Sequence, residues 1–310
     1  MPIYTLTIHG GAGTILREDM TAEMEANYKK ALQDALDAGY ALLEKGQSAL
    51  EAVRASVISL EDNILFNAGK GAVFAKDGRQ EMDASIMEGK NRMAGVVSAV
   101  RNIRNPIELA YAVMTKSPHV MLTGQGAAEF AKLHGIKTEA DEYFYSDFRH
   151  NQWKQLQDSD TVALDHNVTV KDKKFGTVGA AACDAQGNIA AATSTGGMTN
   201  KQWGRVGDSS IIGAGTYANN NTCAISCTGH GEPFIRAVAA YDVSCLMEYK
   251  NLSLHEAMNV VVHDKLMQID GEGGMIGVDA KGNAAMIFNS EGMYRGIRKS
   301  DGVNEVLIYK

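Results

Sequence analysis

The sequence Phe175-Gly176-Thr177-Val178-Gly179 marks the point where a long polar segment ends and a run of β-forming residues begins. A threonine hydroxyl acts as a nucleophile if a base removes its proton, and a threonine at a chain terminus carries that base in its own α-amine. Residue 177 is internal, so this chemistry requires the Gly176–Thr177 bond to be cut. Gly176 has no Cβ and tolerates the unusual dihedrals of a strained bond. Alone, a Gly-Thr pair opening a strand is most often structural, so other motifs must decide.

The composition fits a globular protein with a large core. Of the 310 residues, 45% are hydrophobic and 22% are charged. The formal net charge is -7 and no basic block occurs, so nucleic acid and anionic membrane surfaces are not expected as partners. The start of the chain lacks the features of a secretion signal, and no run approaches the roughly 18 apolar residues that span a membrane. These features predict a cytoplasmic protein.

The four cysteines do not suggest a disulfide framework in a chain of this length. They are Cys183, Cys223, Cys227 and Cys245, and their neighbours are apolar. Cys223 and Cys227 could suggest a metal site, but no histidine or further cysteine flanks them at ligand spacing. The pattern predicts buried thiols in a reducing compartment.

The first half of the chain begins with alternating β-formers, which predict a strand over residues 4–9. The glycine turn Gly10-Gly11-Ala12-Gly13 follows, and we interpret it as packing beneath a site, because no Lys-Ser/Thr pair follows as a phosphate loop requires. Apolar spacing predicts helices over residues 21–45, from a Ser48 capping box to residue 60, from an Asn105 N-cap and Pro106 to residue 116, and over residues 124–134. Strands are expected at residues 72–75, 81–87 and 93–100.

The second half of the chain combines hairpins with pairs of helices. Residues 183–189 and 278–284 each read as strand, tight turn and strand, and helices are expected at residues 232–249 and 253–270. Between the two halves, residues 137–174 show no clear period, and their end, residues 170–174, is polar enough to be mobile. The order is not a strict strand–helix alternation, which predicts an α+β layered fold with largely antiparallel sheets.

Several motifs together carry a resemblance that none of them carries alone. Besides Gly176-Thr177-Val178-Gly179, they are His9-Gly10-Gly11-Ala12-Gly13, Phe66-Asn67-Ala68-Gly69, Met82-Asp83-Ala84-Ser85-Ile86-Met87, Thr193-Ser194-Thr195-Gly196-Gly197, Gly204-Arg205-Val206-Gly207-Asp208-Ser209 and Thr228-Gly229-His230-Gly231-Glu232. With them the chain resembles, nearly end to end, the plant-type L-asparaginase/isoaspartyl peptidase family of N-terminal nucleophile hydrolases. The resemblance implies a four-layer αββα sandwich formed by one domain, residues 1–310. It also implies self-cleavage into residues 1–176 and 177–310, and an assembly of two α and two β subunits.

The resemblance implies a threonine amidohydrolase that cleaves the side-chain amide of L-asparagine and the β-peptide bond of isoaspartyl dipeptides. Thr177 matches the nucleophile, and Gly176 precedes the cleaved bond. Thr195 matches the residue whose hydroxyl hydrogen-bonds the nucleophile. Thr228 and Gly229 match the oxyanion site, which supplies one hydroxyl and one backbone N–H.

The remaining site positions follow from the same motifs. Asn67 matches a residue that keeps the nucleophile oriented. Arg205 matches the residue that binds the substrate α-carboxylate, for which a two-pronged donor suits better than lysine. Asp208 matches the acceptor for the α-ammonium group, with the Gly231 carbonyl beside it. His230 is secondary, because the α-amine already supplies a base.

The family also holds a monovalent cation, usually sodium, through backbone carbonyls. The corresponding positions here are Leu60, Glu61, Asn63, Phe66, Ala68 and Lys70. Carbonyl oxygens are hard ligands that suit such an ion, whereas a lysine close to it could weaken the site. No cofactor is expected for the chemistry itself.

Three other readings compete with this one. A glycosylasparaginase usually shows His-Asp before its nucleophile and a secretion signal, whereas this chain has Phe175-Gly176 and no signal. A dinucleotide-binding protein is suggested by residues 213–218, but a true fingerprint opens a helix, and a strand is expected here. The third is a catalytically silent binding module on the same scaffold. The motifs leave open whether asparagine or β-aspartyl dipeptides are the better substrate.

Overall fold

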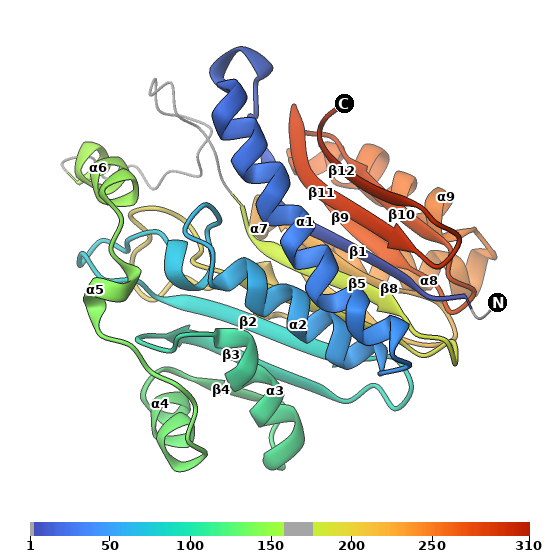
Figure 1. Cartoon of the computed structure of the whole chain (residues 1–310), viewed down its shortest axis with the longest axis horizontal. Helices are drawn as coiled ribbons and strands as arrows, with labels where there is room; N and C mark the ends of the chain where they lie inside the picture. The colour runs from blue at the N-terminus through green and yellow to red at the C-terminus, as the bar shows by residue number, and fades with distance from the viewer. Residues whose placement is uncertain (1–2, 158–175) are drawn as a thin grey trace.

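The computed structural model describes residues 3–157 and 176–310; residues 170–174, which were expected to be mobile, lie outside this range. Its helices and strands follow one another as mixed hairpins and helix pairs (Figure 1). The strands are β1 (Thr5–Gly13), β2 (Met82–Glu88), β3 (Ala94–Val100), β4 (Met121–Thr123), β5 (Val178–Cys183), β6 (Ile189–Thr195), β7 (Thr216–Ala218), β8 (Ala224–Gly229), β9 (Gly273–Val278), β10 (Ala284–Phe288), β11 (Gly292–Lys299) and β12 (Asn304–Tyr309).

The four helices predicted in the first half of the chain are present, and two more helices, at Asp141–Phe144 and Asp147–Leu156, lie where no period was found. Thr21 caps the first helix, and its hydroxyl accepts a hydrogen bond from the Met24 amide. Ser48 caps the second by accepting from the Glu51 amide. The α-helices are α1 (Ala22–Glu44), α2 (Ala49–Glu61), α3 (Pro106–Lys116), α4 (Gly124–Leu133), α5 (Asp141–Phe144), α6 (Asp147–Leu156), α7 (Gly231–Ala237), α8 (Ala239–Lys250) and α9 (Leu254–Asn259).

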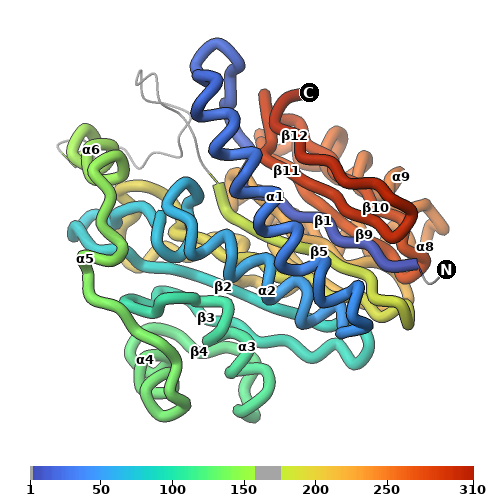
Figure 2. Tube along the Cα trace, viewed as in Figure 1, coloured from blue at the N-terminus to red at the C-terminus, as the bar shows by residue number. Residues whose placement is uncertain are grey.

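The strands form two sheets. One has eight strands in the order β12-β11-β1-β5-β6-β2-β3-β4, and the other has four in the order β10-β9-β8-β7. Figure 2 shows β1 running between β11, which comes from near the C-terminus, and β5, which comes from the middle of the chain. Every pair of these strands is antiparallel except β3 and β4. The predicted α+β class with largely antiparallel sheets is therefore confirmed.

The two sheets pack face to face, and helices cover their outer faces. Helices α1, α2 and α3 pack on the larger sheet, whose inner strands β1, β5 and β6 contact β7, β8 and β9 of the smaller sheet. Helices α8 and α9 pack against the far face of the smaller sheet (Figure 1). The layers run helix, sheet, sheet, helix.

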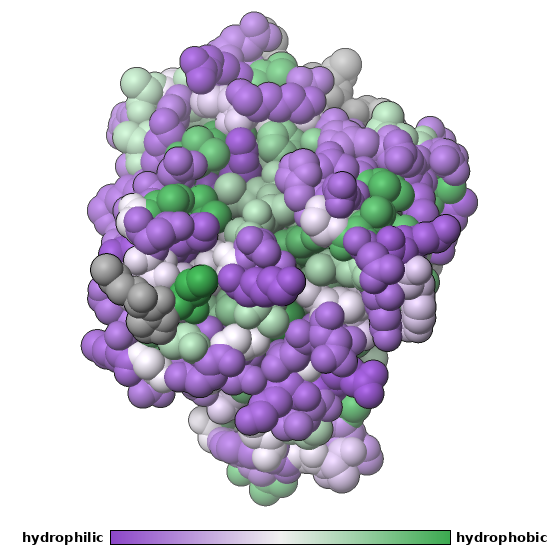
Figure 3. All heavy atoms as spheres, turned by 90° about the vertical axis from the view of Figure 1, so that its right-hand side faces the viewer, coloured by the Kyte–Doolittle hydropathy of each residue, from purple (hydrophilic) through white to green (hydrophobic). Residues whose placement is uncertain are grey.

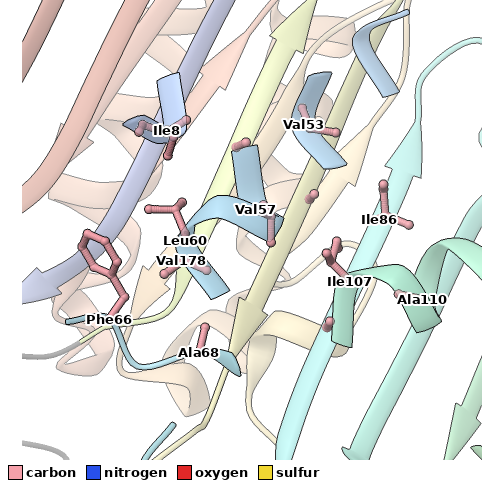
Figure 4. Packing of buried hydrophobic residues seen from close by; sticks show 14 of the residues in the cluster. Ile8, Val53, Val57, Leu60, Phe66, Ala68, Ile86, Ile107, Ala110 and Val178 are labelled. Carbon is pink, nitrogen blue, oxygen red and sulfur yellow. The ribbon is translucent and has the colours of Figure 1, made fainter. Parts of the chain in front are cut away.

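In the core between α2 and the larger sheet, small side chains on the strands face larger side chains on the helix. Strands β5 and β6 are rich in alanine, which lets the helix approach closely. Val53, Val57 and Leu60 of α2 fill this space and lie close to Ile8 and Val178 (Figure 4). Each such buried aliphatic side chain contributes about 1.5–3 kcal/mol relative to leaving it exposed. This packing fixes the strand that begins directly after Thr177.

Two of the predicted strands are wrong in extent. Residues 72–75 form no strand, and only an isolated bridge joins Phe74 to Gln80. The strand predicted at residues 4–9 continues as β1 through the glycines to Gly13, with a bulge between His9 and Gly11. Pairing with β11 supplies the hydrogen bonds that hold these glycines in a strand, so a distant partner overrides the local turn signal.

Both C-terminal helices are interrupted. The helix predicted at residues 232–249 breaks at Val238, whose φ is 50°. The amides of Ala240 and Tyr241 donate to the carbonyls of Ala214 and Gly213 in place of helical partners. The helix predicted at residues 253–270 is α9 followed by a π-helix (Val260–Lys265) and a 3-10 turn (Met267–Ile269), and the amide side chain of Asn289 donates to the Val262 carbonyl. Tertiary hydrogen bonds cause both departures.

Two expected helix caps also differ from the structure. The Glu51 carboxylate does not complete a capping box at Ser48, because it pairs with Arg54 and Tyr111. Asn105 makes no side-chain cap for α3, and its amide donates to Asp62 instead.

The remaining features of the fold are its surface and its cysteine thiols. Hydrophobic and hydrophilic side chains are interspersed on the face shown in Figure 3. Among the described residues, no helix combines the length and the apolar character needed to cross a membrane. Cys183, Cys223 and Cys227 are buried free thiols, as predicted, whereas Cys245 is partly exposed. The cytoplasmic location stays a prediction of the sequence.

Candidate active site

Thr177 lies immediately before β5 and is 8% exposed. Its hydroxyl donates to Oγ1 of Thr195, which ends the neighbouring strand β6, at 3.2 Å. The Ser209 hydroxyl approaches Thr177 Oγ1 from another side, at 3.5 Å. The structure therefore brings together the two threonines that the sequence motifs single out, in a site largely closed to water.

Gly176 occupies a position that only glycine fits. Its φ of 153° is one that side-chain-bearing residues rarely adopt, and a Cβ there would lie 2.0 Å from Cα of Gly11. The same Cβ would lie 3.1 Å from the backbone nitrogen of Ala12. The glycine-rich end of β1 thus packs directly against the Gly176–Thr177 bond, as the packing interpretation of this motif predicted.

Asn67 holds the loop that follows Thr195. Its side-chain amide donates to the Gly197 carbonyl at 2.8 Å, and its own carbonyl accepts from the Gly196 amide at 2.9 Å. The Gly197 amide in turn donates to Thr195 Oγ1 at 2.9 Å. Through these contacts Asn67, which lies on a neighbouring loop, holds Thr195 in the position where it accepts from the Thr177 hydroxyl.

Thr228 and Gly229 end strand β8, opposite the glycines of β1. Thr228 is fully buried, and its Oγ1 accepts from the Ala12 amide at 3.2 Å, which leaves its own hydrogen available for donation. Gly229 has a φ of 143°, and a Cβ there would lie 2.4 Å from the Glu272 carbonyl oxygen. Because Ala12 lies beside Gly176, the Thr228 hydroxyl is close to the Gly176–Thr177 bond.

Arg205, Asp208 and Gly231 meet at the start of α7. A Cβ on Gly231 would lie 2.8 Å from Asp208 Oδ1 and 3.0 Å from Arg205 Nη2. Asp208 is 3% exposed, and its Oδ2 has no hydrogen-bond partner among the described residues. Burial raises the pKa of Asp208 to about 7, although Arg205 opposes the rise. A buried carboxylate oxygen without a partner is a site for a cation or a donor.

Arg205 has a partner that the sequence analysis did not assign. Its Nε and Nη2 donate to the two carboxylate oxygens of Glu232, at 2.9 and 2.8 Å. Partial burial disfavours ionisation of Glu232, but hydrogen bonds from His230 and Arg205 outweigh it and hold the pKa of this carboxyl well below its usual value. His230 Nε2 lies 3.3 Å from Glu232 Oε2. Glu232 directly follows Gly231 in the Thr228–Glu232 motif, and this position beside a predicted site residue was the sequence signal for its pairing with Arg205.

Comparison with known proteins identifies the family of this chain over almost its whole length. The family model described as "Asparaginase" matches residues 2–308. The chain belongs to the asparaginase family.

Relatives in this family are similar along almost the full chain. An isoaspartyl peptidase of Escherichia coli (strain K12) is 50% identical over 292 residues, which cover 94% of this chain and 91% of the relative. An isoaspartyl peptidase/L-asparaginase of Xenopus laevis is 42% identical, covering 96% and 92%. A probable isoaspartyl peptidase/L-asparaginase 2 of Arabidopsis thaliana is 38% identical, covering 99% of both.

In the loop between α2 and Ala72, two glycines each lie against a backbone carbonyl oxygen. A Cβ on Gly69 would lie 2.4 Å from the Glu61 carbonyl oxygen, and a Cβ on Gly71 would lie 2.1 Å from that of Phe66. The Glu61 carboxyl is fully buried, and burial raises its pKa to about 8, so it adds no charge to the loop near neutral pH. Lys70 Nζ lies 5.3 Å from the centre of the Tyr143 ring. Backbone carbonyl oxygens are the type of ligand that a hard monovalent cation prefers.

Sequence reasoning missed His9 as a neighbour of Thr177. His9 is fully buried in β1, and its Nδ1 lies 2.9 Å from the Thr177 carbonyl oxygen. The available signal is that His9 ends the alternating stretch of β1 directly before the glycines. Its contacts across the sheets could not be read from the chain.

Proposed function

We propose that this chain is an autoprocessing threonine amidohydrolase that cleaves the side-chain amide of L-asparagine and the β-peptide bond of isoaspartyl dipeptides. The observation that carries the proposal is the Thr177 hydroxyl, which is bonded to Thr195 and directly follows a glycine that no other residue could replace. The names of the relatives support the substrate class.

The first reaction cuts the chain before Thr177. Thr177 Oγ1 attacks the carbonyl carbon of Gly176, the C–N bond breaks, and the nitrogen takes the proton that the hydroxyl loses. Water then hydrolyses the resulting ester. The products are a carboxylate on Gly176 and a free α-amine on Thr177, which supplies the base for the second reaction.

The second reaction uses the same hydroxyl on substrate. The α-amine of Thr177 takes the hydroxyl proton as Oγ1 attacks the substrate β-carbonyl, and the Thr195 hydroxyl orients the nucleophile. The Thr228 hydroxyl and the Gly229 N–H stabilise the oxyanion. Ammonia or an amino acid leaves with a proton from the α-amine, and water hydrolyses the aspartyl ester to free the enzyme.

The substrate's free α-groups are bound at the start of α7. Arg205 pairs with the α-carboxylate, and Asp208 accepts from the α-ammonium together with the Gly231 carbonyl. The unpartnered Oδ2 of Asp208 supports this assignment, because an ammonium group supplies the donor and the charge that this oxygen lacks.

A single N-terminal nucleophile hydrolase domain of residues 1–310 accounts for the layer order. The larger sheet interleaves strands from both sides of residue 176, because β11 and β5 flank β1 while β6 pairs with β2. Cleavage therefore leaves both fragments, 1–176 and 177–310, in one core. The mature unit is an assembly of two copies of this pair, as the family resemblance implies.

Steady-state kinetics on three substrates test the activity. L-Asparagine, a β-aspartyl dipeptide and N4-glycosylated asparagine present the same α-groups with different leaving groups. We expect turnover of the first two. Preferential release of the sugar would instead identify a glycosylasparaginase, and no turnover by a fully cleaved preparation would identify a silent module.

The raised pKa of Asp208 predicts a pH dependence of substrate binding. The carboxyl must be ionised to accept the ammonium, so kcat/KM should increase as the pH rises through about 7. The bound ammonium holds Asp208 ionised, so the pH profile of kcat at saturating substrate should not show the titration of Asp208. It should show only the titration of the Thr177 α-amine, with a pKa of about 7.7–8.0.

The measurement is both profiles on one preparation, with Asp208→Asn as the comparison. We expect the variant to lose roughly 10- to 100-fold in kcat/KM while still cutting itself. Parallel profiles of kcat and kcat/KM would show that Asp208 does not titrate in substrate binding.

We further propose that backbone carbonyls of the loop bind sodium and thereby tie the end of α2 to Asn67. The holding residues are Leu60, Glu61, Asn63, Phe66, Ala68 and Lys70. A bound ion stabilises the folded state by mass action, by about 2.7 kcal/mol at a concentration 100 times its Kd.

Exchanging sodium for a large organic cation should lower the melting temperature by several degrees. Gly69→Ala is the comparison, because its Cβ would crowd the Glu61 carbonyl and should abolish the response to sodium. Identical melting curves of the wild type with and without sodium would remove the ion from this loop.

A further inference from the structure

The peptide groups that follow Thr195 are held in place by hydrogen bonds. The Gly196 amide donates to the Asn67 carbonyl at 2.9 Å, and the Gly197 carbonyl accepts from the Asn67 side chain at 2.8 Å. Between these two contacts lies the peptide that joins Gly196 to Gly197, and its N–H donates to Thr195 Oγ1 at 2.9 Å. Asn67 therefore holds the peptides on either side of the one that contacts Thr195.

The carbonyl of this middle peptide is bound by a buried lysine. Lys201 is 2% exposed, and its Nζ donates to the Gly196 carbonyl at 2.9 Å and to the Glu81 carbonyl at 2.6 Å. Burial lowers the pKa of Lys201, whereas the negative charges of Asp83 and Glu81 oppose this effect and favour the ammonium form. Glu81 directly precedes β2, on which Asp83 pairs with Thr195. The lysine thus ties the middle peptide to the strand beside Thr195.

A peptide between two glycines turns over more easily than one between residues with side chains. The rotation changes ψ of the residue before it and φ of the residue after it, and neither Gly196 nor Gly197 has the Cβ that restricts these angles. One orientation directs the N–H to Thr195 and the carbonyl to Lys201, and the other does the reverse. An ammonium group donates and cannot accept, so Lys201 bonds the first orientation and not the second.

This orientation determines what the Thr195 hydroxyl can do. Thr195 Oγ1 accepts from the Gly197 amide at 2.9 Å and from the Thr177 hydroxyl at 3.2 Å. Neither contact uses the hydrogen of Thr195 itself. When Thr177 gives up its proton to attack, that hydrogen is available to stabilise the charged oxygen. A carbonyl in place of the Gly197 N–H would accept this hydrogen and withdraw it from Thr177.

We propose that Lys201 is a positioning residue for the nucleophile, because it holds the Gly196–Gly197 peptide with its N–H toward Thr195 and so leaves the Thr195 hydrogen to Thr177. The inference rests on the proposed function, in which Thr177 is the nucleophile. Lys201 acts through the peptide on both reactions of Thr177, since self-cleavage and substrate hydrolysis use the same oxygen.

The orientation of the peptide is measured in crystal structures of Lys201→Met in a Thr177→Ala background, which needs no activity. Methionine keeps the apolar stem and removes the donor. We expect the N–H toward Thr195 in Thr177→Ala alone, and the Gly196 carbonyl turned toward Thr195 when Lys201→Met is added. Lys201→Gln serves if Lys201→Met does not fold, because its amide offers a donor and an acceptor and no longer selects one orientation. A peptide that keeps its N–H on Thr195 without the lysine would overturn the proposal.

The self-cleavage rate gives the second readout, in protein that retains Thr177. Lys201→Met should slow self-cleavage roughly threefold to tenfold. In a Thr195→Val background the same change should alter the rate by less than about twofold, because the hydroxyl on which the lysine acts is absent. An equal factor in both backgrounds would show a general structural effect and overturn the proposal.

Lys265→Met is the matched control, because it removes an ammonium group that is bonded to Asp242 on helix α8. We expect it to change neither the peptide nor the cleavage rate. Failure of the proposed function is distinct from these outcomes, because it would appear as self-cleavage of Thr177→Ala. That result would remove the role of Lys201 in catalysis, whereas the peptide orientation seen in the crystal structures would stand.

Discussion

Thr177→Ala is expected to remain a single chain of 310 residues and to lose amidase activity by at least about 10³-fold. The wild type should separate on a denaturing gel into fragments of residues 1–176 and 177–310. Both reactions need the same oxygen, because it first attacks Gly176 and later the substrate. Without the cut, the α-amine that serves as base is also never released, so a single substitution removes the nucleophile and its base together.

Two comparisons make this result specific. Thr177→Ser keeps a hydroxyl and should still cut itself, whereas Thr5→Ala removes a buried hydroxyl at the far end of β1, bonded to the Gly282 carbonyl, and should leave cleavage unchanged. N-terminal sequencing of the smaller wild-type fragment locates the cut. A fragment beginning anywhere other than Thr177 would contradict the assignment.

The parts of the fold that local sequence determines were predictable. Helix α1 has a threonine cap and an apolar face that repeats along its length, and both signals are contained in the helix itself. The break at Val238 has no such signal, because it depends on carbonyls of Gly213 and Ala214 that a distant loop presents. The extension of β1 through its glycines likewise depends on β11, whose paired residues Gly292 to Tyr294 lie near the other end of the chain.

The candidate site also has parts that could be predicted from the sequence and parts that could not. The motifs singled out Thr177, Thr195 and Asn67, and the structure connects them through one loop. It also brings Arg205, Asp208 and Gly231 to one place, and their roles stay predictions. The buried hydroxyl groups beneath Thr177 were not predictable, because a serine or threonine on a strand gives the same sequence pattern whether it faces water or a second sheet.

Arg205→Lys should lower kcat/KM for β-aspartyl dipeptides by about one to two orders of magnitude. The loss corresponds to one charge-assisted hydrogen bond, about 1.5–3 kcal/mol. Arg205 already gives Nε and Nη2 to Glu232, and its planar group still has Nη1 to offer a substrate carboxylate. A lysine has one ammonium group for both carboxylates, so it cannot hold Glu232 in this two-pronged geometry and bind substrate as well.

Self-cleavage of the same variant separates binding from chemistry. The Gly176 carbonyl presents no α-carboxylate, so Arg205→Lys should release Thr177 at close to the wild-type rate. Arg236→Lys, an exposed change on the same helix as Glu232, should alter neither reaction. If cleaved Arg205→Lys turned over β-aspartyl dipeptides as the wild type does, Arg205 would not bind the α-carboxylate. The substrate would then have to be recognised by Asp208 and Gly231 alone, which select an ammonium group but not an amino acid.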